Sequence, residues 1–256
     1  MAIEVGSINV LSSALAVPSS FSDPLDNSVG AIANPQNLAS VNNFNWVFSV
    51  LGWDSPFGNP SSFNSYGMGA VLSNGGGRGL SIQLSQTGAN PPQTVCNGII
   101  PALFLPVASA LRSAFYAAKI KFIQFTINNA ANGVPGVGLM NFEDATGTGA
   151  PSNQFAHDSY FLQFDGGLRR DNSGANFVQL HNGIGLVQSD VWRLSMDASN
   201  AAQTVLTVTR NGVVAYTVTD NNLNRLTGNA FPFIGVVNNG NAMLGEFKNF
   251  SCGPGL

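Results

Sequence analysis

Two strands joined by a tight turn are contained in TVLTVTR-NG-VVAYTV (residues 204–218), and VWRLSM (residues 191–196) just before them predicts a third strand. Asn211-Gly212 can adopt the left-handed conformation at both central positions of a two-residue turn, the geometry that matches the twist of paired strands. The stretch therefore predicts an antiparallel hairpin and, with it, an all-β fold.

The turn also sets the pairing of this hairpin. A regular two-residue turn places Val208 opposite Ala215 and Thr207 opposite Tyr216, so that both faces of the hairpin carry apolar residues. We expect either a bulge at Gly212 that shifts the register, or a cover on the second face. The N-terminal segment, a helix or another subunit could supply that cover.

Short strands are predicted at regular spacing along the rest of the chain, divided by Gly, Asn and Asp, as is typical of a sandwich or barrel. Residues 99–118 alone have helical character, with apolar side chains four residues apart. In the strand expected at 119–127 the apolar phase slips between Phe122 and Ile123, which predicts a bulge or burial on both faces. Trp192 is expected in the core. Further strands are expected over 45–51, 69–72, 80–84, 137–140, 160–164, 176–180, 233–237 and 244–250.

The order of elements from about residue 118 to 250 resembles the concanavalin A-like lectin/glucanase superfamily, which includes laminin-G-like and SPRY-like domains. The resemblance lies in the strand at 122–127, the segment GVGL (136–139), VWRL (191–194), the hairpin LTVTRNG (206–212) and the closing FIG (233–235) and FKNF (247–250). It implies two curved antiparallel sheets in a jelly-roll sandwich, and it covers about half of the chain.

Two segments are predicted. Residues 1–45 form an N-terminal arm that reaches a neighbouring subunit, or an edge segment of the chain's own domain. Residues 46–256 form a single β-sandwich domain with one short helix.

The chain carries unusually little charge. Only 9% of its residues are charged and its net charge is −3, whereas charged residues make up roughly 25% of an average soluble domain. This composition argues against binding nucleic acid or anionic membranes, which need clustered Lys and Arg. It suits proteins that pack against neighbouring subunits or that meet neutral sugars. No signal peptide and no membrane-spanning stretch are visible, and we expect the protein on a virion or in an extracellular location.

Aromatic and amide groups gather on one loop. Trp53, Asp54, Phe57 and Tyr66 lie among Asn and Gly. Aromatic rings can stack on the apolar face of a pyranose while amide groups bond its hydroxyls, so these four residues are a candidate glycan-binding site. The alternative is that the rings anchor a long loop to the sandwich.

A second candidate is Gln179-Leu180-His181, which resembles the Gln-x-His motif of polysaccharide lyases with this fold. In those enzymes the Gln and His side chains project from one strand face, neutralise a uronate and abstract a proton. The companion motifs of these lyases are not convincingly present, and a loop His after a strand is the simpler explanation.

Metal and disulfide chemistry are weakly indicated. No His or Cys cluster has the spacing of a transition-metal site, so we expect no metal and no cofactor. Calcium alone stays open, because loop carbonyls and single carboxylates such as Asp165 can bind it. Cys96 and Cys252 could form one disulfide or remain reduced and buried.

These observations predict a non-enzymatic structural or adhesive protein of a particle surface, such as a phage decoration or fibre protein, with glycan binding as a further role. Its partners would be other protein subunits, in a homo-oligomer or among capsid or fibre neighbours. A soluble lectin or carbohydrate-binding module is the first alternative, and a polysaccharide lyase or glycosidase is the second.

Overall fold

The computed structural model describes residues 20–23, 25, 29–33, 37–39, 45–50, 68–73, 79–84, 101–104, 110–131, 134–141, 158–171, 178–185, 187–237 and 243–255. Over these residues the chain is mostly strand. The elements are β1 (Phe21–Asp23), β2 (Val29–Ala33), β3 (Asn37–Ala39), β4 (Asn45–Val50), β5 (Met68–Ser73), β6 (Gly79–Leu84), β7 (Pro101–Phe104), α1 (Ala110–Ala117), β8 (Ile120–Ala131), β9 (Val134–Met140), β10 (Ser159–Gln163), β11 (Leu168–Asp171), β12 (Val178–His181), β13 (Val191–Asp197), β14 (Thr204–Arg210), β15 (Val213–Asp220), β16 (Phe231–Val237) and β17 (Met243–Pro254).

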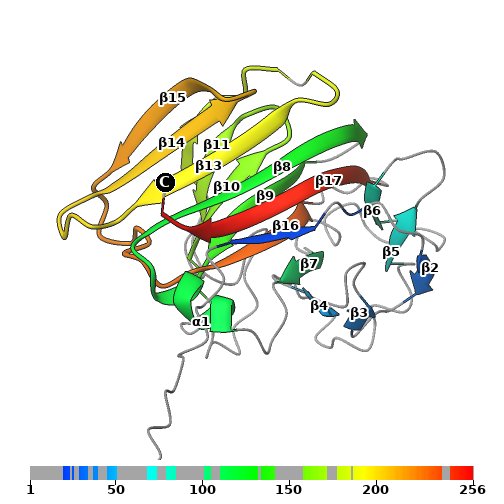
Figure 1. Ribbon diagram of the computed structural model, residues 1–256. Coiled ribbons are helices and arrows are strands. Elements are labelled where there is room, and N and C mark those ends of the chain that lie inside the picture. Colours follow the sequence, from blue (N-terminus) through cyan, green and yellow to red (C-terminus); the bar gives the residue numbers. More distant parts are fainter. Residues whose placement is uncertain are drawn as a thin grey trace, which may run out of the picture.

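The strands form two antiparallel sheets that lie one on the other, with α1 near one end (Figure 1). The nine-stranded sheet has the order β15-β14-β13-β8-β17-β6-β5-β2, and β1 pairs with β17. The eight-stranded sheet has the order β12-β11-β10-β9-β16-β7-β4-β3. The predicted two-sheet antiparallel sandwich is confirmed.

The core between the sheets follows from strict alternation along the strands. Every second residue of β8, β13 and β14 faces the eight-stranded sheet. Every second residue of β9 and β10 faces the nine-stranded sheet. Trp192 is completely buried, as expected. The other fully buried residues of these strands in the core are Ile123, Phe125, Ile127, Leu194, Met196, Leu206, Val208, Val137, Leu139, Tyr160 and Leu162.

The β14–β15 hairpin has the predicted turn and a different register. Asn211 and Gly212 have φ angles of 53° and 79°, and Arg210 pairs with Val213. The register then shifts, because Thr209 lies opposite Val214 whereas Val208 lies opposite Tyr216, which leaves Ala215 as a bulge.

This bulge explains why a regular pairing would place apolar residues on both faces of the hairpin. It moves Tyr216 and Val218 to the face of Val208, where they pack against the core. Thr207 and Thr217 then share the outer face, with their Oγ1 atoms 3.4 Å apart. A bulge is thus present, at Ala215 rather than at Gly212, and no cover on the second face is needed to explain the pattern.

The segment with helical character divides into two elements. Its first part, Pro101–Phe104, is strand β7, paired with β4 and β16. The helix covers only Ala110–Ala117. Pro101 and Pro106 flank the apolar run of β7, and proline lacks the N–H that a helix interior requires. The short helix is confirmed, and the helical character expected for residues 101–104 is wrong.

The phase slip in β8 leaves one aromatic side chain outside the core. Phe122 faces the outer side of the nine-stranded sheet, where the Arg193 guanidinium lies 3.8 Å from its ring centroid. Ile123 and Phe125 face the core. The pairing of β8 with β17 shifts twice, with Asn128 of β8 as the extra residue at one shift and a residue of β17 between Lys248 and Ser251 at the other, so neither shift falls between Phe122 and Ile123.

The first 45 residues contribute strands to the chain's own sheets. β1 pairs with β17, while β2 and β3 are the last strands of the two sheets on one side. These strands correspond to the edge-segment alternative, and the division at residue 45 stays a prediction. No helix in the described part of the chain is long and apolar enough to cross a membrane.

Candidate functional site

The four aromatic-loop residues lie outside the part that the structure describes. Trp53, Asp54, Phe57 and Tyr66 all fall within residues 51–67. Their role in glycan binding stays a prediction. Cys96 also lies outside, and its suggested partner Cys252 is a buried free thiol.

Gln179 and His181 lie on β12, separated by a bulge. Gln179 lies opposite Arg169 of β11, whereas His181 lies opposite Leu168, so Leu180 is an extra residue in the ladder. A bulge between two side chains that would otherwise share a face turns them to opposite faces. Gln179 is exposed on the outer face, and His181 is directed toward the edge between the sheets. This geometry does not present both side chains to one uronate.

Three polar side chains converge on the outer face beside Gly167, and we call Gln163, Asp165 and Gln179 the amide cluster. A Cβ atom added to Gly167 would lie 2.3 Å from Gln163 Oε1, 3.0 Å from Asp165 Oδ1 and 3.2 Å from Gln179 Nε2. The missing side chain of Gly167 is therefore the space in which the cluster assembles.

Hydrogen bonds fix the cluster and leave part of it open. Gln179 Nε2 donates to Gln163 Oε1 (3.5 Å) and to the carbonyl oxygens of Leu168 and His181. Asp165 Oδ1 accepts from the Gly167 amide (2.9 Å). Within the described part of the chain, Gln163 Nε2, Gln179 Oε1 and Asp165 Oδ2 accept or donate no hydrogen bond. The cluster thus offers one donor and two acceptors.

An aromatic layer lies next to the amide cluster on the same sheet face. Phe161 and Phe233 lie 5.8 Å apart with an angle of 14° between their rings. A Cβ atom on Gly136 or Gly138 would come within 2.7 Å of one of these rings, so the glycines let the rings lie close to the sheet. Phe161 and Phe233 are fully buried. The two buried rings therefore pack on the same sheet face as the amide cluster.

Tyr216 and His181 close the edge between the two sheets. Their rings are stacked, with centroids 3.6 Å apart and an angle of 6°. The Tyr216 hydroxyl donates to the Gly166 carbonyl (2.6 Å), which ties β15 to the turn that carries Asp165. Burial, and then the charge of Asp165, raise the pKa of Tyr216 above its usual range. Tyr216 therefore stays a neutral hydrogen-bond donor that positions this turn.

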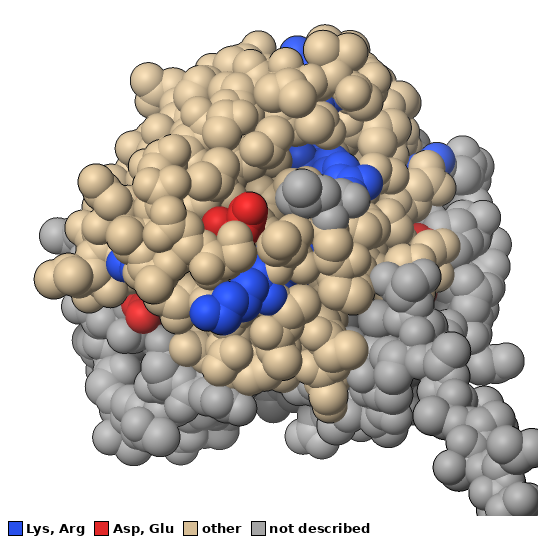
Figure 2. Space-filling model, turned by 60° about the vertical axis from the view of Figure 1, so that its left-hand side comes forward, with Lys and Arg blue, Asp and Glu red and all other residues tan. Residues whose placement is uncertain are grey.

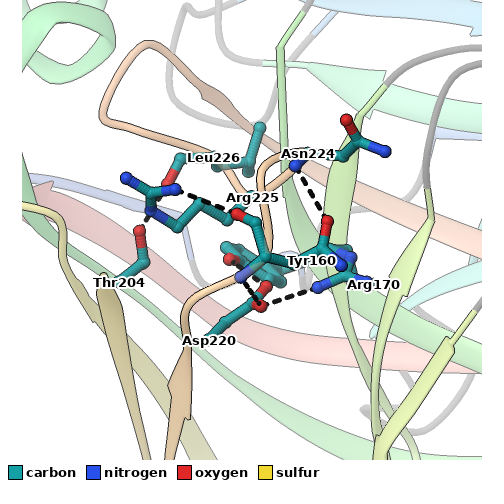
Figure 3. Close-up of polar contacts among 8 residues, drawn as sticks. Tyr160, Arg170, Thr204, Asp220, Asn224, Arg225 and Leu226 are labelled. Atoms are coloured by element: carbon teal, nitrogen blue, oxygen red, sulfur yellow. Dashed lines mark hydrogen bonds and ion pairs between the residues drawn. The ribbon is translucent and has the colours of Figure 1, made fainter. Parts of the chain in front are cut away.

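A buried ion pair joins the two sheets where β15 ends (Figure 3). Arg170 Nη1 lies 2.6 Å from Asp220 Oδ1, and their side chains are 5% and 4% exposed. The Tyr160 hydroxyl donates to Asp220 Oδ2 (2.8 Å) and the Asn222 amide to Asp220 Oδ1 (3.1 Å). Burial, and then the Asp220 carboxylate, raise the pKa of Tyr160. The contacts of Asp220 join the end of β15 to β10 and β11, so they fix the two sheets relative to each other at this end.

A second buried charge lies at the N-terminal end of β8. The Lys121 ammonium is fully buried and donates to the carbonyl oxygens of Tyr116 (2.9 Å), Gly228 (2.6 Å) and Ala230 (3.1 Å). Burial lowers its pKa to about 7, and the proximity of Cys252 opposes that shift. Lys121 thus ties the C-terminal end of α1 to the segment before β16, and it has no access to a ligand.

The face of the molecule drawn in Figure 2 carries few charges. Figure 2 shows a face on which most of the coloured surface belongs to residues other than Lys, Arg, Asp and Glu. In the residues that the structure describes, no three His, Cys, Asp or Glu side chains gather as a metal site would require. Calcium binding has no test here and stays open.

Sequence reasoning missed Gln163 and Gly167. They are remote from Gln179 in the sequence and belong to no motif. The signal that could have found them is the run QFDGG (163–167), a strand end followed by an Asp-Gly-Gly turn.

No family model and no curated protein matches the chain. Several solved structures do match it. A structure reported with endo-acting O-glycanases of the human gut microbiota has a TM-score of 0.50 and 8% identity, covering 91% of this chain and 98% of that chain. A β-1,3-1,4-glucanase (lichenase) from a mouse hindgut metagenome has a TM-score of 0.48 and 11% identity, covering 92% and 99%. The Emp47p carbohydrate recognition domain has a TM-score of 0.44 and 12% identity, covering 93% and 96%.

At these identities the match shows the fold alone. The matched fold consists of the two stacked antiparallel sheets of this chain that are described above. The chain therefore has a two-sheet antiparallel jelly-roll fold of the concanavalin A-like type.

Proposed function

We propose that this protein binds neutral glycans without cleaving them, and that the amide cluster contacts the sugar. The observation that carries the proposal is the set of open polar atoms on Gln163, Asp165 and Gln179, gathered around Gly167. A sugar hydroxyl both donates and accepts a hydrogen bond, so adjacent donor and acceptor atoms suit it.

The charge of the cluster favours neutral sugars over uronates. Asp165 is its only charged member and would repel a sugar carboxylate. The nearby Arg169 guanidinium is only 3% exposed and lies over the Phe161 ring, 5.3 Å from its centroid. The bulge at Leu180 adds a second argument, because it separates Gln179 from His181 and so disfavours the lyase alternative.

Affinity for neutral oligosaccharides tests this function. Calorimetry or NMR titration with β-glucan and mannan oligosaccharides would be run on the wild type, Gln163→Ala and Gln179→Ala. Each variant removes about one hydrogen bond, so we expect about fivefold weaker binding. Gln124→Ala is the matched control, since Gln124 lies on the outer face of the other sheet opposite Arg193. Unchanged affinity in both cluster variants would rule out this site.

Two further measurements separate the remaining alternatives. Trp53→Ala in the same titrations tests the aromatic loop, and equal binding would exclude it. Incubation with alginate and β-glucan tests for an enzyme, and new unsaturated or reducing ends would contradict the non-enzymatic proposal.

A place on a virion or other particle stays a prediction, as does a homo-oligomer. Its support is the low charge, which lets many copies pack closely without repulsion. Light scattering of the purified chain would test it, and a strict monomer would weaken it.

A further inference from the structure

Two Asn-Gly pairs lie within the described residues, and the structure treats their side chains differently. Asn182-Gly183 follows β12, and Asn211-Gly212 forms the turn between β14 and β15. Both pairs are exposed. Asparagine followed by glycine is the pair in which the next backbone nitrogen most easily reaches the side-chain carbonyl, because glycine has no Cβ to hinder the approach.

Asn211 is held at both ends of its amide. Its Oδ1 accepts from the Val191 amide (2.8 Å), and its Nδ2 donates to Asp190 Oδ1 (2.8 Å). Asp190 is itself anchored by an ion pair with Arg210. Attack on the Asn211 side chain would have to break both of these bonds first.

Asn182 has no such restraint. No side-chain hydrogen bond of Asn182 and no bond from the Gly183 amide occurs within the described part of the chain; Asn182 contributes only its carbonyl oxygen, which lies 2.6 Å from His181 Nδ1. Both reacting groups, the side-chain amide and the Gly183 nitrogen, are therefore free and open to water.

We propose that Asn182 is a site of spontaneous deamidation and that Asn211 is protected from it. The Gly183 nitrogen loses its proton and bonds to Asn182 Cγ, the bond from Cγ to Nδ2 breaks, and ammonia leaves with that proton. Water then opens the succinimide at either carbonyl and gives aspartate or isoaspartate. The reaction needs no enzyme, oxidant or cofactor.

The product changes the charge beside the amide cluster. Asp165 lies against Gly183, since a Cβ atom there would come 2.0 Å from Asp165 Oδ2. Deamidation adds a second carboxylate at this place, and an isoaspartate also lengthens the backbone by one carbon. The negative charge beside the amide cluster would thus increase as a protein sample ages.

Peptide mass spectrometry tests the proposal without any glycan. The folded protein is incubated at about pH 8 and sampled over time, and peptides that contain residues 182 and 211 are compared for the mass of a carboxylate and for isoaspartate. The two bonds that Asn211 must break slow its reaction about 30-fold relative to Asn182, at the usual net strength of such bonds. In concentrated urea both sites react at similar rates, because both asparagines precede glycine.

A matched variant completes the design. Asn182→Gln removes the change at residue 182, because glutamine would have to form a larger ring, and leaves the peptide of residue 211 as in the wild type. Equal rates at the two sites in the folded protein overturn the proposal. So does a folded protein in which residue 182 stays intact while the urea sample reacts.

Discussion

Removing the charge of Asp220 tests whether the buried ion pair holds the two sheets together. Asp220 neutralises Arg170, whose side chain is 5% exposed, and accepts hydrogen bonds from Tyr160 and Asn222. In Asp220→Asn the guanidinium remains buried without a counter-charge, which costs about 3–5 kcal/mol of unfolding free energy. This is a large part of the total stability of about 5–15 kcal/mol for a domain.

A double-mutant cycle separates the pair from its surroundings. Arg170→Met alone leaves a buried carboxylate and should cost a similar amount. The double variant removes both charges, so its loss should fall short of the sum of the two single losses by about 2 kcal/mol or more. Urea unfolding of the four proteins, followed by tryptophan fluorescence, gives these values.

The Arg210–Asp190 pair is the matched comparison, because the Arg210 side chain is 25% exposed. Its coupling should be about 0.5–1 kcal/mol, since water screens it. The reasoning fails if the Asp220 and Arg170 losses add to within about 0.5 kcal/mol, or if the two pairs couple equally.

Three further changes test other parts of the structure. Gly167→Ala places a Cβ atom among the tips of Gln163, Asp165 and Gln179, and we expect it to weaken glycan binding with a stability loss of about 1 kcal/mol, measured by titration and urea unfolding. Deletion of Ala215 removes the extra residue and keeps Tyr216 opposite Val208 on the core face; we expect at most about 1 kcal/mol of destabilisation, whereas a loss of about 3 kcal/mol would contradict the assigned bulge. The pKa of Lys121 is about 7, below its ordinary value of 10.5, so above neutral pH the unfolded chain binds more protons than the folded one and the free energy of unfolding rises with pH. Between pH 7 and about pH 8.5 we expect a gain of about 1.5 kcal/mol in wild type that is absent in Lys121→Met; a pH-independent wild type would refute the burial of this amine.

The sequence predicted those elements whose pattern is local. The Asn211-Gly212 turn and the strands around it depend on alternation and on two residues that tolerate positive φ, and they appear where expected. The spacing of the short strands predicted a sandwich or barrel, and the resemblance to the concanavalin A-like superfamily implied the two sheets.

The positions of the bulges could not be predicted, because they depend on which face of each strand is buried. At Ala215 and Leu180 one extra residue is accommodated so that Tyr216 reaches Gly166 and His181 stacks on Tyr216. These contacts join strands from different sheets and leave no local trace. The amide cluster could not be predicted either, because its glutamines lie on β10 and β12 and meet only in the folded chain, beside Gly167.

Lys121 shows a different limit. Alternation places it on the core face with Ile123 and Phe125, but a lysine in that position is expected at the surface. It is buried because three carbonyl groups converge on it, and two of them, from Gly228 and Ala230, are 107 and 109 residues away in the sequence.

The position of β17 has a consequence for how the chain is made. β17 is the last strand in the sequence, yet it lies inside the nine-stranded sheet, between β8 and β6. While the ribosome is still producing the preceding strands, β6 and β8 cannot be joined and their backbone groups remain exposed. The sandwich can therefore close only after β17 has left the exit tunnel, and until then we expect the preceding strands of the nascent chain to depend on protection from aggregation.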